Sequence, residues 1–174
     1  FVGRKEDMVE YKKELEELKK VIEIVEGGET RSASVYNGLT ALDKHNPEVV
    51  VVHDAVRPFI EEFFVKQSID AAYKFGAAVV AVNAVDTVAE VENDFMTKVL
   101  NRETLRNLQT PQTFRYSILR DSYEKARKEK KVYTDDTGCV MDFGASVKIV
   151  AGSDKNFKIT LPSDLEKAHF LAKG

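Results

Sequence analysis

The chain has 174 residues, enough for one domain with its own hydrophobic core. Its composition is that of a globular protein, and its net charge of −3 argues against a general binder of nucleic acid or of membrane surfaces. The single cysteine, Cys139, excludes an internal disulfide and fits a reducing compartment, so we expect a cytoplasmic protein. No apolar run approaches the roughly 20 residues of a membrane span.

The first third of the chain predicts helices and strands in alternation. Charged residues surround a single apolar stripe in residues 6–20, which is typical of a surface helix. Four consecutive valines bounded by turn residues are typical of a strand covered on both faces. We expect a helix over 6–20, a short strand at 22–25, a second helix on which Val35, Leu39 and Leu42 share a face, and the valine strand at 49–52.

The rest of the chain continues the alternation, with one interruption. We expect a helix at 61–75 that ends at Gly76, a strand at 77–85, a polar hairpin with strands at 86–91 and 96–100, a basic helix at 117–130, a strand at 146–150, and a last helix to about residue 172 that opens with a capping box at 163–166. Strands alternating with helices predict an α/β fold with a doubly wound, mostly parallel sheet. We expect a single domain over 1–174, from which residues 85–101 project as an arm.

Charged residues directly follow the predicted valine strand. Ligands of open α/β sheets bind beyond the carboxyl ends of the strands, and Asp54 follows the valines directly after His53. A carboxylate in this position suits Mg²⁺, which prefers oxygen ligands and bridges to phosphates. The alternative is that Asp54 caps the next turn or pairs with Arg57. We interpret His53 as structural.

Other segments offer weaker signals, each with an ordinary alternative. Two glycines before a helix, in Gly27–Ser34, let the backbone approach a ligand or simply make a turn. Arg102 could clamp a phosphate or be solvated, and Lys158 could face a ligand or lie on a solvated strand. We interpret Thr110–Thr113 as a rigid polar turn. The acidic Thr134–Thr137 could hold a metal, or a threonine there could cap a helix.

The order of these motifs carries more information than any one of them. GGxxRxxSVxNGL, VHDAVRPF, a VxDT turn, NRxxLxxxQTPQxF, TDD, and NxKIT with PxDLExA follow one another along nearly the whole chain. In this the sequence closely resembles the 2-C-methyl-D-erythritol 4-phosphate cytidylyltransferases of non-mevalonate isoprenoid synthesis. The resemblance implies a Rossmann-like nucleotidyltransferase fold. It also implies transfer of a cytidylyl group from CTP to methylerythritol phosphate, with Mg²⁺ on the nucleotide phosphates and pyrophosphate as the second product.

The resemblance also implies roles for individual residues. Asp54 would bind Mg²⁺, while Arg102 and Lys158 would position methylerythritol phosphate for attack. Many relatives have Asp where this chain has Glu29. The remaining implied positions are Gly28, Glu29 and Ser34 around the cytosine and ribose, Ala55 near the ribose, Arg57 as a brace of its loop, Thr87 on the second substrate, and Thr110, Asp135 and Asp154 as supporting residues.

Two further expectations follow from the resemblance. In the family the hairpin arm crosses a two-fold axis, which implies a homodimer in which Thr87 and Arg102 serve the neighbour's site. The family also opens with a strand and a basic, glycine-rich loop that this sequence lacks, so we expect a missing N-terminal part and no catalysis by these 174 residues alone. Two alternatives stay open: a ribitol-5-phosphate cytidylyltransferase, and a catalytically silent dimeric module that binds nucleotide or a partner protein.

Overall fold

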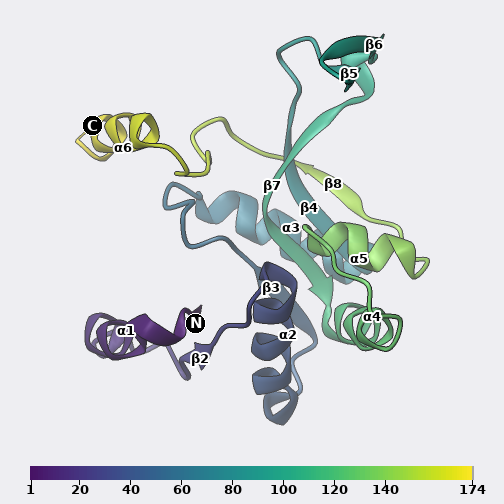
Figure 1. Ribbon diagram of the computed structural model, residues 1–174. Coiled ribbons are helices and arrows are strands. Elements are labelled where there is room, and N and C mark those ends of the chain that lie inside the picture. The colour runs from purple at the N-terminus through teal and green to yellow at the C-terminus, as the bar shows by residue number, and fades with distance from the viewer. Residues whose placement is uncertain (174) are drawn as a thin grey trace. The chain divides into compact units, whose positions relative to one another are not determined.

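The computed structural model describes residues 1–173, which form two compact units. Unit 1 comprises Phe1–Val50 and Phe114–Val147, and unit 2 comprises Val51–Thr113 and the chain from Lys148 onward (Figure 1). Within residues 1–173, no helix combines the length and the apolar character that a bilayer crossing requires.

Unit 1 is built mainly from helices. Its elements are β1 (Val2–Gly3), α1 (Met8–Leu15), β2 (Val25–Glu26), α2 (Arg31–Leu42), α4 (Tyr116–Lys128) and α5 (Asp136–Asp142), with 3-10 turns at Lys5–Asp7 and Asp43–His45. Leu39, Leu119 and Val140 are almost fully buried, one from each of α2, α4 and α5. The Tyr116 hydroxyl lies 2.8 Å from the Leu39 carbonyl oxygen, which joins α4 to the end of α2.

Unit 2 is built around a sheet. Its elements are α3 (Glu62–Phe75), β4 (Ala77–Asn83), β5 (Ala89–Glu92), β6 (Phe95–Val99), a 3-10 turn at Arg102–Thr104, β8 (Lys148–Ala151) and α6 (Pro162–Ala172). β3 (Val49–Val52) and β7 (Arg106–Arg115) run from one unit into the other, and the sheet has the order β3-β7-β4-β8. Ala78, Val80 and Val150 form its core, against which Phe64 and Ala71 of α3 pack.

The sheet contains a parallel pair, as the sequence predicts, and one reversed strand. β4 and β8 are parallel neighbours, with Val80 opposite Val150. β4 leads into the β5–β6 hairpin and β7 leads back from it (Figure 1), so these two neighbouring strands run in opposite directions. The predicted α/β class is therefore confirmed, and β7 makes the sheet mixed.

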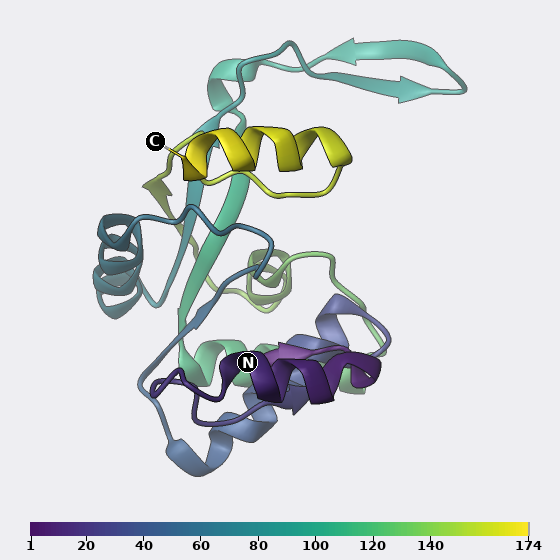
Figure 2. The same ribbon diagram turned by 90° about the vertical axis from the view of Figure 1, so that its left-hand side faces the viewer.

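The predicted hairpin forms as an antiparallel pair between Ala89 and Val99. Asn93 and Asp94 both have positive φ, as the tight turn of a two-residue hairpin requires. Figures 1 and 2 show the pair beyond the ends of β4 and β7. Every residue of β6 is exposed, so this hairpin contributes little to the core of unit 2.

Three sequence predictions are wrong in detail. The helix expected at 6–20 ends at Leu15, and the strand expected at 22–25 is reduced to Val25–Glu26. Both were overextended because their apolar residues find little to pack against: Leu18 and Ile22 are 53% and 69% exposed. The final helix is not capped by its Ser163 box. Instead, Asp164 Oδ2 accepts hydrogen bonds of 2.8 Å from the amides of Thr160 and Leu161.

The most consequential error concerns Thr110–Thr113, which is no turn but the buried middle of β7. Polar residues suggest a turn, yet here they have partners far away in the sequence. The Thr113 hydroxyl lies 2.8 Å from that of Ser68 on α3, and the Thr110 hydroxyl lies 3.0 Å from the ring of His53. Internal hydrogen bonds thus allow a polar segment to form a central strand.

Candidate functional site

A carboxylate with two cations lies just beyond the end of β3. Asp54 Oδ2 is 3.2 Å from Lys158 Nζ and 3.5 Å from Arg57 Nε. The Asp54 and Arg57 side chains are 16% and 12% exposed, whereas that of Lys158 is 42% exposed. One negative and two positive charges leave this group with a net positive charge, which attracts phosphate.

The loop that carries Asp54 is held by a chain of hydrogen bonds. The Asp54 amide donates to Thr110 Oγ1, which lies 3.0 Å from His53 Nδ1, and His53 Nε2 lies 3.0 Å from the Arg57 carbonyl oxygen. Because a carbonyl oxygen only accepts, a neutral His53 carries its proton on Nε2, and its Nδ1 accepts from the Thr110 hydroxyl. The structural interpretation of His53 is confirmed, and the Thr110 hydroxyl is engaged by the loop.

A buried asparagine joins the same loop to the segment that carries Lys158. Asn156 is 1% exposed, and its Nδ2 donates to the Thr110 carbonyl oxygen at 2.7 Å and to Gln109 Oε1 at 3.1 Å. The Asn156 carbonyl oxygen accepts from Arg57 Nη1 at 2.8 Å. The sequence analysis missed Asn156 as a site residue. Its place at the start of the NFKIT motif was the available signal.

In unit 1, the glycine loop before α2 is tightly closed. Ser34 Oγ accepts from the Gly28 amide and donates to the Thr30 carbonyl oxygen, both at 3.0 Å. A Cβ added at Gly28 would lie 2.4 Å from Ala33 Cβ, so no larger residue fits without movement. Thr30 caps α2 by accepting from the Ala33 amide, while Gly28 and Glu29 are exposed.

The two adjacent acids of the TDD motif have different surroundings. Asp135 Oδ1 accepts from the Gly138 amide at 3.0 Å and so caps α5. Asp136 is fully buried and contacts Arg31 and Tyr123. In residues 1–173, no group of three or more His, Cys, Asp or Glu side chains is arranged so that it could hold a metal ion. The capping alternative holds, with Asp135 rather than a threonine as the cap.

The remaining predicted residues of unit 2 lie at its surface. Arg102 is exposed and its Nη1 donates to the Val85 carbonyl oxygen at 2.7 Å, which joins the two ends of the hairpin segment. Thr87, Ala55 and Asp154 are also exposed. The structure therefore brings Lys158 and Arg57 to Asp54, while Arg102 bonds at the base of the hairpin.

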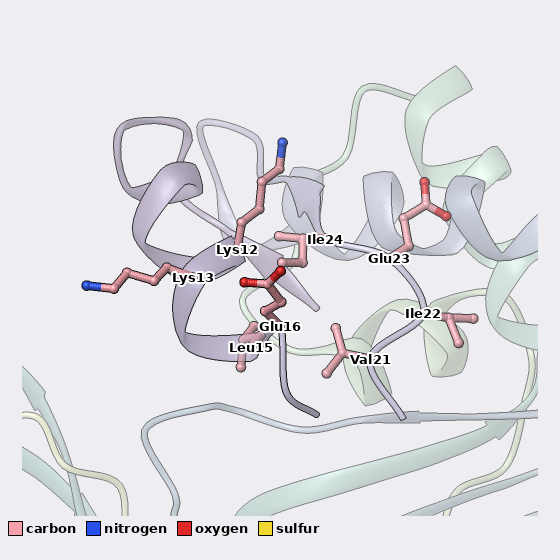
Figure 3. A pocket seen from close by; sticks show the side chains of 8 residues that line it. All are labelled: Lys12, Lys13, Leu15, Glu16, Val21, Ile22, Glu23 and Ile24. Carbon is pink, nitrogen blue, oxygen red and sulfur yellow. The ribbon is translucent and has the colours of Figure 1, made fainter. Parts of the chain in front are cut away.

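An open hollow on unit 1 contains none of the predicted site residues. It has a volume of about 580 Å³ and is lined by Lys12, Lys13, Leu15 and Glu16 of α1 and by Val21–Ile24 (Figure 3). Figure 3 shows the Lys13 side chain extending away from the other labelled residues.

A comparison with protein families identifies the chain. A family model described as 2-C-methyl-D-erythritol 4-phosphate cytidylyltransferase matches residues 1–173. The chain belongs to this family. A curated relative of that name from Pelotomaculum thermopropionicum is 46% identical over 157 residues, which are 90% of this chain and 66% of the relative. One from Geobacillus thermodenitrificans is 40% identical over 85% of this chain and 64% of the relative. The chain thus spans just under two thirds of the length of these family members.

Solved structures of the family have the same fold. The 4-diphosphocytidyl-2C-methyl-D-erythritol synthase of Anaerococcus prevotii is 35% identical and matches with a TM-score of 0.90 over 99% of this chain and 77% of that one. The 2-C-methyl-D-erythritol 4-phosphate cytidylyltransferase of Thermus thermophilus is 38% identical, with a TM-score of 0.80 over 87% of this chain and 73% of that one. The predicted fold class and the resemblance drawn from the motifs are confirmed.

Proposed function

We propose that this protein transfers a cytidylyl group from CTP to 2-C-methyl-D-erythritol 4-phosphate, in non-mevalonate isoprenoid synthesis. A phosphate oxygen of the second substrate attacks the α-phosphorus of CTP. The bond to the β-phosphate oxygen breaks, and pyrophosphate leaves with the electron pair, giving 4-diphosphocytidyl-2-C-methyl-D-erythritol. The observation that carries the proposal is the contact of Lys158 with Asp54 beside Arg57, in a chain of this family.

Lys158 and Arg57 provide positive charge where phosphate charge must be stabilised. Phosphoryl transfer needs little covalent chemistry from the protein, so positioning and electrostatic stabilisation supply most of the rate. Lys158 is partly exposed and belongs to a flexible side-chain type, so it can exchange its contact with Asp54 for a phosphate oxygen. Arg57 is held by the Asn156 carbonyl oxygen and keeps the loop in place.

Asp54 fits a role as a magnesium ligand shared with the substrate. Mg²⁺ is commonly bound by one or two carboxylates together with substrate phosphates and water. Asp54 offers one carboxylate, and the described residues 1–173 contain no cluster of metal-ligating side chains, which fits such a shared site better than an all-protein cage. When bound, Mg²⁺ supplies charge neutralisation at the nucleotide phosphates.

The other predicted residues complete the proposal. Gly28, Glu29 and Ser34 form the loop for cytosine and ribose, supported by its tight closure and by the exposure of Gly28 and Glu29. Ala55 lies near the ribose, while Asp135 and Asp154 have supporting roles. Thr110 acts through the loop that it holds. The one cysteine, Cys139, is buried and free, which is compatible with a cytoplasmic protein.

We further propose a homodimer formed through the hairpin arm, residues 85–101. Val91, Phe95 and Met96 are 63%, 76% and 67% exposed on this arm, and exposed apolar patches mark interaction surfaces. Thr87 and Arg102 then serve the site of the partner subunit. Mixed dimers of Arg102→Ala and Asp54→Ala protein are expected to recover activity, because one of the two sites has both residues intact. Mixed dimers without any recovery would contradict a shared site.

The overall function is tested by substrate choice. Because no catalysis is expected from these 174 residues alone, pyrophosphate release is measured on the full-length protein, with CTP and Mg²⁺ and with methylerythritol phosphate, ribitol 5-phosphate or no second substrate. We expect release with methylerythritol phosphate. A preference for ribitol 5-phosphate would favour the related cytidylyltransferase. CTP binding without pyrophosphate release in the presence of either second substrate would favour a silent module.

The role of Lys158 has a matched control in the same segment. Lys158→Met is expected to cost about 2–4 kcal/mol of transition-state stabilisation, measured as the loss in kcat/KM. Lys155→Met removes an exposed lysine three residues away and is expected to leave the rate unchanged. Equal rates for the two variants would remove Lys158 from the mechanism.

A further inference from the structure

The buried acid Asp136 has no role in the chemistry proposed above. It begins α5, and its carboxylate contacts two other helices of unit 1. Asp136 Oδ2 lies 2.6 Å from Arg31 Nη2 on α2, and its Oδ1 lies 2.5 Å from the Tyr123 hydroxyl on α4. Asp136 is 0% exposed and Tyr123 is 1% exposed. A buried carboxylate is retained only where charged and hydrogen-bonding partners compensate its desolvation.

We propose that Asp136 is a positioning residue for the nucleotide, which holds the Gly28–Ser34 loop in its binding geometry through Arg31. This inference rests on the proposed function, in which that loop binds the cytosine and ribose of CTP. Arg31 is the first residue of α2 and directly follows the cap residue Thr30. The Asp136–Arg31 contact therefore fixes the N-terminal end of α2, where the helix joins the loop.

The loop is expected to move with this end of the helix because the two are hydrogen-bonded and closely packed. Ser34, one turn into α2, is hydrogen-bonded to both Gly28 and Thr30. Gly28 already packs so closely on Ala33 that not even a methyl group fits between them. A displacement of Arg31 is therefore passed on to Gly28 and Ser34, rather than absorbed by a gap.

The Tyr123 hydroxyl that bonds to Asp136 is held in its donating form. Burial, followed by the negative charge of Asp136, raises the pKa of the Tyr123 hydroxyl well above its usual range, so the phenol remains a donor. The neighbouring Cys139 is also fully buried, and burial raises the pKa of its thiol to about 12. The Arg31 side chain is 30% exposed, so the pair lies at the edge of the core rather than deep within it.

The adjacent acids of the TDD motif thus have separate tasks. Asp135 bonds to an amide three residues ahead, at the start of α5. Asp136 bonds to Arg31, which is 105 positions away in the sequence. The motif therefore combines a local helix cap with a long-range anchor for a loop that is distant in the chain.

The test substitutes each partner of Asp136 conservatively. Arg31→Lys keeps the charge but loses the planar, multiply donating guanidinium, and Tyr123→Phe removes one hydroxyl without touching the ion pair. Arg120→Lys is the matched control, because Arg120 pairs with Asp43 at the opposite end of α2, at 2.9 Å. Asp136→Asn is the direct variant, and the two conservative variants remain informative if it does not fold.

Steady-state kinetics separate positioning from general destabilisation. We expect Arg31→Lys to raise the KM for CTP roughly tenfold and to leave the KM for methylerythritol phosphate within about twofold, because the displaced loop contacts only the nucleotide. Arg120→Lys is expected to change neither KM. An equal rise in both KM values, or the same CTP effect in Arg120→Lys, would overturn the proposal.

Hydrogen exchange tests the anchor without reference to any substrate. The Gly28 amide, bonded to Ser34, and the Ala33 amide, bonded to Thr30, are expected to exchange several-fold faster in Arg31→Lys and Tyr123→Phe, but not in Arg120→Lys. Unchanged exchange would refute the anchor even if the protein is a cytidylyltransferase. Faster exchange in a protein that does not bind CTP would refute the proposed function and leave the anchor in place.

Discussion

Replacing Gly28 with alanine tests whether the glycine loop recognises the nucleotide by its shape. The added Cβ would lie 2.4 Å from Ala33 Cβ and 3.1 Å from the Ala33 carbonyl carbon, whereas ordinary contact begins at 3.4 Å. The loop must therefore give by about 1 Å, and backbone atoms leave it little freedom to do so. Overpacking of this kind costs about 1–3 kcal/mol of stability.

The larger effect is expected on the ligand. A displacement of about 1 Å in a positioning segment can cost roughly 100-fold, so we expect Gly28→Ala to weaken CTP binding by that order. Titration calorimetry with CTP and Mg²⁺ measures the affinity, and thermal unfolding measures the stability. Gly138→Ala is the control: its Cβ would lie 3.9 Å from the nearest heavy atom, on the Tyr133 ring, and alanine is favoured within a helix such as α5.

Two results would refute this reasoning. If Gly28→Ala binds CTP within about threefold of the wild type, the loop either adapts without cost or does not contact the nucleotide. If Gly138→Ala weakens CTP binding as much as Gly28→Ala does, the loss reflects general damage to unit 1 rather than the shape of the loop.

Three further predictions concern stability and assembly. Burial raises the pKa of the Cys139 thiol from 9.0 to about 12, so the stability it contributes is complete below pH 9 and is lost as the pH rises from 9 to about 12. Between pH 8 and pH 10, denaturant unfolding should show that the wild type loses about 1.4 kcal/mol of unfolding free energy that Cys139→Ala does not lose. The same pH dependence in both proteins would disprove this prediction. Thr30→Ala should lower the free energy of unfolding by about 1 kcal/mol, while Thr30→Ser, which keeps the cap, should not; equal losses would exclude capping as the cause. Phe95→Ser on the hairpin should weaken the dimer in sedimentation, unlike Val9→Ser on α1, which is 83% exposed; a dimer as stable as the wild type would argue against the arm.

Apolar periodicity predicted the elements that pack on a core. α2, α3 and α4 lie where the sequence predicts them, because each presents a buried face of regularly spaced residues such as Leu39 and Leu119. The same rule overextended the first helix, since an apolar stripe does not reveal whether a packing partner exists. β7 was missed because its stability depends on long-range hydrogen bonds such as that between Thr113 and Ser68, which local composition does not report.

The chemistry of the site was predictable in part. Asp54 was identified by its place after a buried strand, and its contact with Lys158, 104 residues further along the chain, was suggested by the order of motifs. The sequence could not reveal that the second acid of TDD faces the core. In the chain, Asp135 and Asp136 look equivalent, and only the direction of the backbone entering α5 separates a helix cap from a buried anchor.

The two hydrogen bonds of the Thr110 hydroxyl limit which residues can occupy this position in the strand. Its hydroxyl must accept from the Asp54 amide and donate to His53 at the same time, which an aliphatic or purely donating side chain cannot do. Serine is the natural substitute at this position, and valine, although of similar shape, leaves both neighbours without their bond. A hydroxyl residue in the strand after the hairpin, together with the His-Asp pair, is therefore a more selective marker of this site than the acid alone.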